Sequence, residues 1–320
     1  MNLNPSGLDY QSFKAFPIDR ILDNSTTDFD LFINVSDHTV LYGTTGYHWL
    51  REELEGLLKH GHTHFLIRPE DSTKVRMYEQ LSKLPGIDNG LPPHERILAI
   101  ESVGALFLRC LYAGELSPGC VDKARVIGES LVSCVAEDPT CVKALNGLQE
   151  HDYYTYHHSV RVASYSVAIA MQMGLTSHDA VMDMALGSIF HDIGKKDVAL
   201  GILNKTGSLT DTEWRIMRSH PENGYEKVKL SLLKHVPLEI ILHHHEKLDG
   251  SGYPHGLDRN SLLPEVQIAT LADIFDALTS ARAYQQKRSR YEALDFIKHK
   301  MVGAKLPTDA FSALISCLAS

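Results

Sequence analysis

The hydrophobic pattern of this 320-residue chain changes once, at residues 83–94 (KLPGIDNGLPPH), and this change limits the folds open to it. Short runs that alternate apolar and polar residues precede this segment, as in a small α/β unit. The segment itself has the proline and glycine content of a linker. From Glu95 onward the apolar spacing is helical. The chain is therefore predicted to be mainly α, with a small α/β domain at 1–85, a linker at 86–94 and an all-α domain at 95–320.

Several elements of the N-terminal unit can be placed from local sequence. Strands are expected at residues 30–35 (DLFINV), 39–42 and 64–68 (HFLIR), a turn at 36–38 and a helix at 49–58. The first 150 residues contain 13 Lys and Arg against 21 Asp and Glu. This acidity is most simply a solvated domain surface, and a regulatory or interaction role is the alternative.

Three helix starts in the C-terminal half have recognisable signals. Thr210 and Glu213 form a T-x-x-E capping box. Pro264 suits the first position of a helix, where its missing N–H costs nothing. Ser177 is a candidate N-cap for a helix with one apolar face over residues 181–189.

Composition narrows the class of protein further. The net charge of −9, from 31 Lys and Arg and 40 Asp and Glu, makes binding to a long nucleic acid unfavourable. The N-terminus lacks a basic segment followed by an apolar run, so no secretory signal is expected. No apolar run reaches the ~20 residues of a membrane span. The five cysteines form no C-x-x-C pair, so the expectation is a cytoplasmic protein with reduced thiols.

Histidine is concentrated in one region, because 11 of the 18 lie between residues 151 and 255. The histidines and carboxylates at or near predicted helix ends are His157, His158, His191, Asp192, His220, His243, His244, His245, Glu246 and Asp273. Imidazole and carboxylate without thiolate suit Fe, Mn or Zn. Since the set exceeds the needs of one ion, two metals that share a bridging carboxylate would use it most economically.

Each of these groups also has an ordinary structural interpretation. A lone histidine such as His220 is more often a helix-end residue than a ligand, and three consecutive histidines can form a solvated helix terminus. Asp273 and Asp276 can lie on an exposed helix face, opposite Leu271 and Phe275. The residue types alone leave a metal site and a set of solvated helix ends as equal alternatives.

The order and spacing of the motifs resemble a known family. The motifs are YYTYHHSVRVA (153–163), HDIGK (191–195), HPENG (220–224), HHEKLDGSGYPHGL (244–257) and ADIFDALTSARAY (272–284). Over about residues 145–300 the chain resembles the HD-GYP family, the HD-superfamily phosphohydrolases that act on cyclic di-GMP in bacteria. The resemblance implies an HD-type helical domain and a metal-dependent cyclic di-GMP phosphodiesterase.

The resemblance also implies a role for individual residues. The implied metal ligands are His158, His191, Asp192, His220, His244, His245 and Asp273. Asp192 would bridge two metals and be part of the catalytic centre. Lys195 would contact the scissile phosphate or donate a proton, and Arg282 would bind substrate phosphate. Tyr253 belongs to the signature loop, formed here by Gly252, Tyr253 and Pro254 with Asp249 and Gly250, which would contact substrate and dock partner proteins.

Three features depart from the family pattern. Members with three metals have a glutamate where this chain has Tyr154, and a tyrosine is not an ordinary Fe or Mn ligand at neutral pH, so two metals are expected. Gln285 stands where the family often has a second basic contact to substrate. His157 and His243 are additional histidines, expected to support a ligand or to be exposed.

The expected reaction is hydrolysis of cyclic di-GMP to linear pGpG, to GMP or to both. Two divalent ions, with iron favoured, manganese second and zinc least favoured, would generate a bridging hydroxide that attacks phosphorus. Cyclic GMP-AMP would be compatible with the same chemistry. The alternative is a weakly active or inactive module that binds a cyclic dinucleotide or partner proteins as a sensor. Partner proteins would dock through the signature loop or the N-terminal domain.

Overall fold

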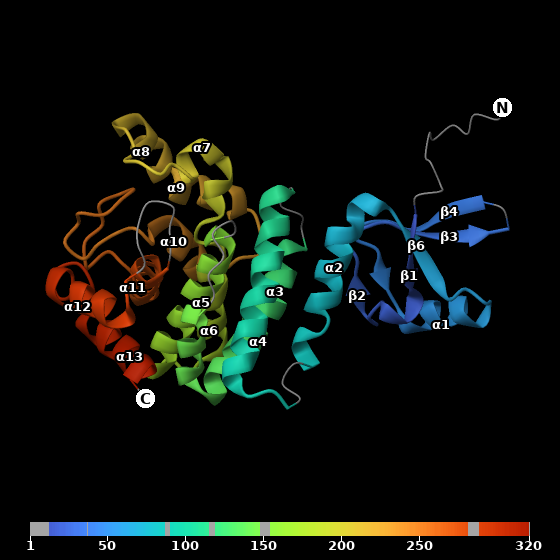
Figure 1. The fold of residues 1–320 in the computed structure, drawn as a ribbon, viewed down its shortest axis with the longest axis horizontal. Coiled ribbons are helices and arrows are strands. Elements are labelled where there is room, and N and C mark those ends of the chain that lie inside the picture. The colour runs from blue at the N-terminus through green and yellow to red at the C-terminus, as the bar shows by residue number, and fades with distance from the viewer. Residues whose placement is uncertain are drawn as a thin grey trace. The chain divides into compact units, whose positions relative to one another are not determined.

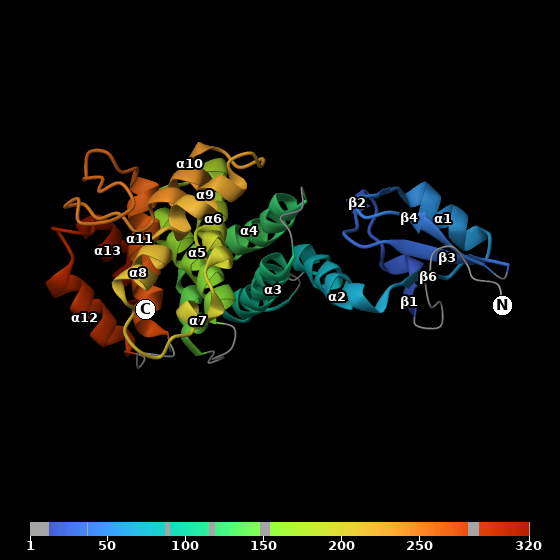
Figure 2. The same ribbon diagram turned by 90° about the horizontal axis from the view of Figure 1, so that it is seen from above.

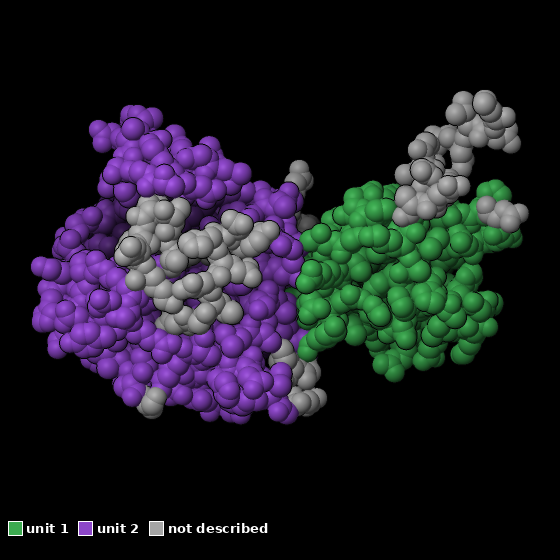
Figure 3. All heavy atoms as spheres, viewed as in Figure 1, with its two compact units in different colours: residues 1–83 green, residues 84–320 purple. Residues whose placement is uncertain are grey.

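A computed structural model describes residues 13–36, 38–86, 90–114, 119–147, 154–280 and 288–319. The chain divides into two compact units, Met1–Lys83 and Leu84–Ser320, which are coloured separately in Figure 3. Among the described residues, no helix combines the length and the apolar character that a membrane crossing requires.

The first unit is built on a four-stranded antiparallel sheet in the order β1-β6-β3-β4 (Figure 1). Its strands are β1 (Lys14–Pro17), β6 (His64–Ile67), β3 (Leu31–Val35) and β4 (His38–Gly43). The other elements are the short strand pair β2 (Ser25–Thr26) and β5 (His48–Trp49) and the helices α1 (Arg51–Lys59) and α2 (Ser72–Leu81). Helix α1 lies along one face of the sheet (Figure 2) and buries Leu54 and Leu57 in the shared core.

The predicted α/β character of this unit is confirmed, but the predicted start of its first helix is wrong. Residue 49 was expected to begin a helix, and the helix begins at Arg51 instead. Trp49 ends β5, where its ring is fully buried. A Cβ atom on Gly43 would lie 2.5 Å from this indole, so the glycine makes room for it. The need to bury the ring therefore decides the local conformation.

The regular elements of the second unit are all helices in its described residues, as expected. The helices of its first half are α3 (Pro93–Ala113), α4 (Cys120–Glu137), α5 (Tyr154–Gln172) and α6 (His178–Phe190). Those of its second half are α7 (Leu200–Leu203), α8 (Asp211–Arg218), α9 (His220–Val228), α10 (His235–His243), α11 (Pro264–Thr279), α12 (Arg290–Lys300) and α13 (Thr308–Ala319). The short 3-10 helices are η4 (Leu84–Gly86), η5 (Pro139–Gly147) and η7 (Ile193–Asp197).

Helices α5 and α6 form the centre of this unit. Helix α5 packs against α3, α6, α11 and α13, and α6 packs against α4, α5 and α10. Every residue from Val181 to Phe190 is buried, so the prediction of a single apolar face on α6 was too narrow. A helix that is covered on all sides needs no polar face.

The predicted helix starts are mostly confirmed. Thr210 accepts a hydrogen bond from the backbone N–H of Glu213, and the Glu213 carboxylate accepts one from the backbone N–H of Thr210, which completes the capping box. Pro264 is the first residue of α11. Ser177 occupies the N-cap position of α6, but its side chain makes no capping hydrogen bond.

Candidate metal centre

Separate helix ends and helix faces bring the seven predicted ligands together. His158 lies on α5 and Asp273 on α11, while His191 and Asp192 follow directly after α6. The remaining three are His220 at the start of α9 and His244 and His245 directly after α10. All except His245 are buried, and the side chain of His245 is 20% exposed.

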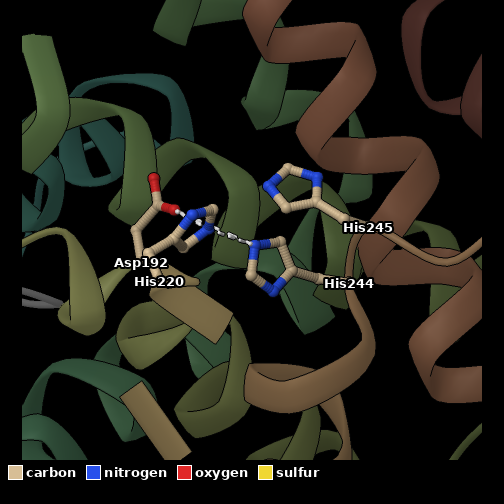
Figure 4. Close-up of side chains that lie close together, drawn as sticks. All are labelled: Asp192, His220, His244 and His245. Atoms are coloured by element: carbon tan, nitrogen blue, oxygen red, sulfur yellow. Dashed lines mark hydrogen bonds and ion pairs between the residues drawn. The ribbon is translucent and has the colours of Figure 1, made fainter. Parts of the chain in front are cut away.

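The donor atoms form two groups. Asp192, His220, His244 and His245 make up one, and His158, His191 and Asp273 the other, with the donor atoms of each group within 4.8 Å of one another. Figure 4 shows the first group, in which Asp192 points toward His220 and His220 toward His244. The two groups together account for every predicted ligand.

The Asp192 carboxylate lies between the two groups. Its Oδ1 is 3.2 Å from His220 Nε2 and 3.8 Å from His244 Nε2. Its Oδ2 is 3.3 Å from His191 Nε2 and 3.7 Å from His158 Nε2. Each oxygen thus faces one group, which is the geometry that a carboxylate shared by two cations requires.

Hydrogen bonds to backbone carbonyls orient three of the imidazoles. Nδ1 of His191 donates to Ser188 O at 2.7 Å, and Nδ1 of His220 donates to Met217 O at 2.7 Å. Nδ1 of His244 donates to Ile241 O at 3.0 Å. Because a neutral ring that donates from Nδ1 has its lone pair on Nε2, each Nε2 can serve as a ligand toward the centre.

A buried charge network supports the fourth histidine. Asp276 Oδ2 accepts a hydrogen bond from His158 Nδ1 at 2.7 Å, and Asp276 Oδ1 accepts one from Arg161 Nε at 2.7 Å. Arg161 Nη1 donates in turn to Glu101 Oε1 at 2.9 Å. The exposed-face interpretation of Asp273 and Asp276 is wrong, since their exposed fractions are 6% and 0%. Only the i, i+3 spacing of His158 and Arg161 on a helix hinted at their shared role.

Burial favours the neutral form of three of these histidines. Burial is the main cause that lowers the pKa of His220, and it lowers the pKa values of His244 and His245 further, with neighbouring histidines adding to the effect. Burial is also the largest single influence on His191, but the charge and hydrogen bond of Asp192, together with Asp273 and the Ser188 carbonyl, outweigh it and raise the pKa of His191. Burial opposes ionisation of Asp192, yet Lys195 and His191 hold its pKa well below the ordinary value. Neutral imidazoles beside an ionised carboxylate are the protonation states that bind a metal.

The donor set fits divalent cations. His191 Nε2 and Asp192 Oδ1 are buried and have no hydrogen-bond partner in the described part of the chain. A buried polar atom without a partner is costly, and a metal ion would remove that cost. The imidazole and carboxylate donors are those of Fe, Mn and Zn sites.

Of the other predicted site residues, Lys195 and Tyr253 contact candidate ligands, whereas Arg282 lies outside the described residues. Lys195 donates to Asp192 Oδ2 at 2.5 Å, and the Tyr253 ring stacks on His245 with ring centroids 4.7 Å apart. Arg282 and Gln285 lie outside the described residues, as does the side chain of Tyr154. His157 and His243 belong to neither donor group: His157 lies 3.3 Å from Glu101 and His243 contacts Glu239 and His255.

Glu246, which composition alone had suggested as a ligand, folds the signature loop instead. Its carboxylate accepts hydrogen bonds from the backbone N–H groups of His255, Gly256 and Leu257. A Cβ atom on Gly252 would collide with the backbone of Glu246, so the loop packs directly on the helix end that carries the histidine pair. The loop is therefore held by hydrogen bonds and close packing against the segment that carries His244 and His245.

A helical domain with a histidine–aspartate pair after a buried helix, facing further histidines, defines a metal-dependent HD-type domain. The HD domain family matches residues 145–305, half of the chain, and the protein belongs to this family. The predicted HD-type domain is thus confirmed at the level of this family.

Two curated relatives illustrate the similarity. A cyclic di-GMP phosphodiesterase of Pseudomonas aeruginosa is 35% identical over 167 residues, 52% of this chain and 40% of that protein. A 3'3'-cGAMP-specific phosphodiesterase of Vibrio cholerae is 37% identical over 166 residues, 52% of this chain and 35% of that protein. The chain thus spans less than half the length of these relatives.

One solved structure shares the fold. An HDG"Y"P protein from Bdellovibrio bacteriovorus superposes with a TM-score of 0.66 at 19% identity, over 96% of this chain and 100% of that one. At this identity the likeness concerns the fold alone.

Proposed function

We propose that this protein is a metal-dependent phosphodiesterase that hydrolyses cyclic di-GMP to linear pGpG, to GMP or to both. The observation that carries the proposal is the Asp192 carboxylate, whose two oxygens face separate groups of imidazoles at 3.2 and 3.3 Å. The similarity to cyclic di-GMP phosphodiesterases at 35% identity supports the choice of substrate.

In this proposal the centre holds two divalent ions, with iron first, manganese second and zinc least favoured. His220, His244 and His245 would hold one ion, His158, His191 and Asp273 the other, and Asp192 both. When bound, such a pair lowers the pKa of water and neutralises charge on a phosphodiester.

The chain's own residues bind and orient the substrate around this centre. Lys195, whose Nζ lies 2.5 Å from Asp192, contacts the scissile phosphate or supplies a proton to the leaving ribose oxygen. Arg282 neutralises charge on the phosphate oxygens. Tyr253 covers His245 and contacts the substrate at the rim of the centre.

A second substrate is supported by the relative that is specific for 3'3'-cGAMP, at 37% identity. Both dinucleotides have the same scissile bond, so the metal chemistry does not distinguish them. The N-terminal unit and the signature loop are proposed to contact regulatory or partner proteins.

The test is to incubate the full chain, loaded separately with Fe(II) and Mn(II), with each dinucleotide and to separate the products by chromatography. Formation of pGpG or GMP supports the proposal. Binding of cyclic di-GMP without any product, in protein that holds both metals, would favour a sensor instead.

A further inference from the structure

Helix α8 is an exposed helix that packs against α9, the helix that begins at the candidate ligand His220. None of its residues is buried, although it carries an indole, Trp214, that is 46% exposed. An exposed aromatic ring forgoes the hydrophobic stabilisation of burial and leaves its face open to contact with another flat group. In Figure 3 the second unit is hollowed directly below the lobe that α8 forms in the same view of Figure 1.

Stacked groups connect this indole with the metal centre. The guanidinium carbon of Arg218 lies 5.6 Å from the ring centroid of Trp214 and 5.4 Å from that of Tyr253. The Tyr253 ring stacks on His245 at 4.7 Å with an interplanar angle of 29°. Two elements far apart in sequence, α8 and the signature loop, thus contribute to one series of flat side chains that ends on a candidate metal ligand.

Arg218 differs from the other arginine of this helix. In the described part of the chain Arg218 makes no ion pair or hydrogen bond, and its contacts are the two rings. Arg215 instead donates to Thr212 within the same helix, and it lies over no ring of a residue that the structure describes. A guanidinium held over aromatic rings keeps its N–H groups available while it offers a flat surface.

We propose that Trp214, Arg218 and Tyr253 form a platform on which a purine base of the nucleotide substrate stacks while its phosphate occupies the metal centre. This inference rests on the proposed function. Nucleobases that are not paired stack on aromatic rings and on arginine planes, and every base has the π-face that this requires. The platform explains why α8 keeps an indole and an arginine in solvent next to the site.

The experiment measures affinities for GMP and for inorganic phosphate by calorimetry, using the full chain loaded with Mn(II). GMP carries a purine and a phosphate but no phosphodiester bond, so a diesterase does not turn it over. Trp214→Ala and Arg218→Ala should each weaken GMP binding about tenfold, the scale of one stacking contact, and leave inorganic phosphate affinity and metal content unchanged. Arg215→Ala, which removes the same charge from the same helix, should change neither affinity.

Two conservative variants separate stacking from other roles. Trp214→Phe should recover much of the GMP affinity, because a ring remains. Arg218→Lys keeps the charge but not the plane, so it should behave like Arg218→Ala. Unchanged GMP affinity in both alanine variants would overturn the proposal. A loss of inorganic phosphate affinity as large as the loss of GMP affinity would also overturn it, and so would full recovery of GMP affinity in Arg218→Lys. If the parent protein fails to hydrolyse cyclic di-GMP but the GMP differences persist, the proposed reaction fails and the platform stands.

Discussion

Asp276 accepts a hydrogen bond from Nδ1 of His158 at 2.7 Å, and this bond fixes which ring nitrogen of His158 faces Asp273. The same carboxylate accepts from Arg161, so one buried charge both orients an imidazole and neutralises an arginine. The geometry of the candidate metal centre therefore depends on a residue that does not itself belong to either donor group.

Asp276→Asn should weaken metal binding about 10- to 100-fold, as loss of a partner behind a metal-ligating histidine does. It should also lower the free energy of unfolding by about 3–5 kcal/mol, because it leaves Arg161 with only part of its buried counter-charge. Asp295→Asn is the matched control, since Asp295 pairs with His299 at the surface. Metal titration and chemical denaturation measure both effects, and an unchanged metal affinity would contradict the orienting role.

Asp192→Ala should abolish binding of two metals, because both donor groups lose the carboxylate that lies between them. Elemental analysis after metal loading is the measurement. Asp197→Ala, which removes an exposed carboxylate paired with Lys227, should keep the full metal content. Two metals per chain in the Asp192 variant would refute the bridging assignment.

Lys195→Gln should retain both metals and lower kcat for the dinucleotide about 10²- to 10⁴-fold, the range of a lost general acid. Lys196→Gln is the control, because the adjacent lysine donates to the backbone carbonyls of Leu111 and Gly114 and not to Asp192. Steady-state kinetics together with metal content separate the two effects. A Lys195 variant with parental kcat would exclude the proton-donor role.

The metal-free protein should become less stable as the pH falls through 6.5, the ordinary histidine value. Burial lowers the pKa values of His220, His244 and His245 in the folded chain, so the unfolded chain binds more protons in this range and its formation is favoured. The raised pKa of His191 acts in the opposite direction, but for one residue only. The midpoint of thermal unfolding should thus drop between about pH 7.5 and 5.5.

Bound metal competes with these protons, so loading should reduce that drop. His235→Ala, at an exposed histidine, should leave the pH dependence unchanged. A midpoint that does not move with pH in the metal-free protein would show that the buried histidines are not held neutral.

Gly194→Ala should destabilise the second unit by about 3 kcal/mol or more, because a Cβ there would collide with the backbone of His220 and Gly224. The glycine of the HDIGK motif lets the turn after α6 lie against the start of α9, where a ligand is carried. Gly201→Ala meets no atom within 4 Å and should be close to neutral. Thermal unfolding compares the two variants, and equal stability would contradict the packing argument.

The ligand set could be predicted from the sequence because a metal site requires particular residue types, which here lie at helix ends. The adjacent pairs His191-Asp192 and His244-His245 each place two donors side by side. It does not show the partners behind the ligands. Arg161 and Glu101 are 60 residues apart, and no local pattern connects them. The start of α1 was misplaced for a related reason, since only the assembled core shows that Trp49 must be buried.

The contact between Glu101 and Arg161 limits how this HD domain can be separated from the rest of the chain. Glu101 lies on α3, before the residues 145–305 that match the HD domain family. A fragment cut at that boundary would lose Glu101, one of the two carboxylates that pair with Arg161, and a helix that packs on α5. A fragment designed to keep the candidate metal centre intact should therefore begin at Pro93, the start of α3. This start lies well before His158, the first candidate ligand.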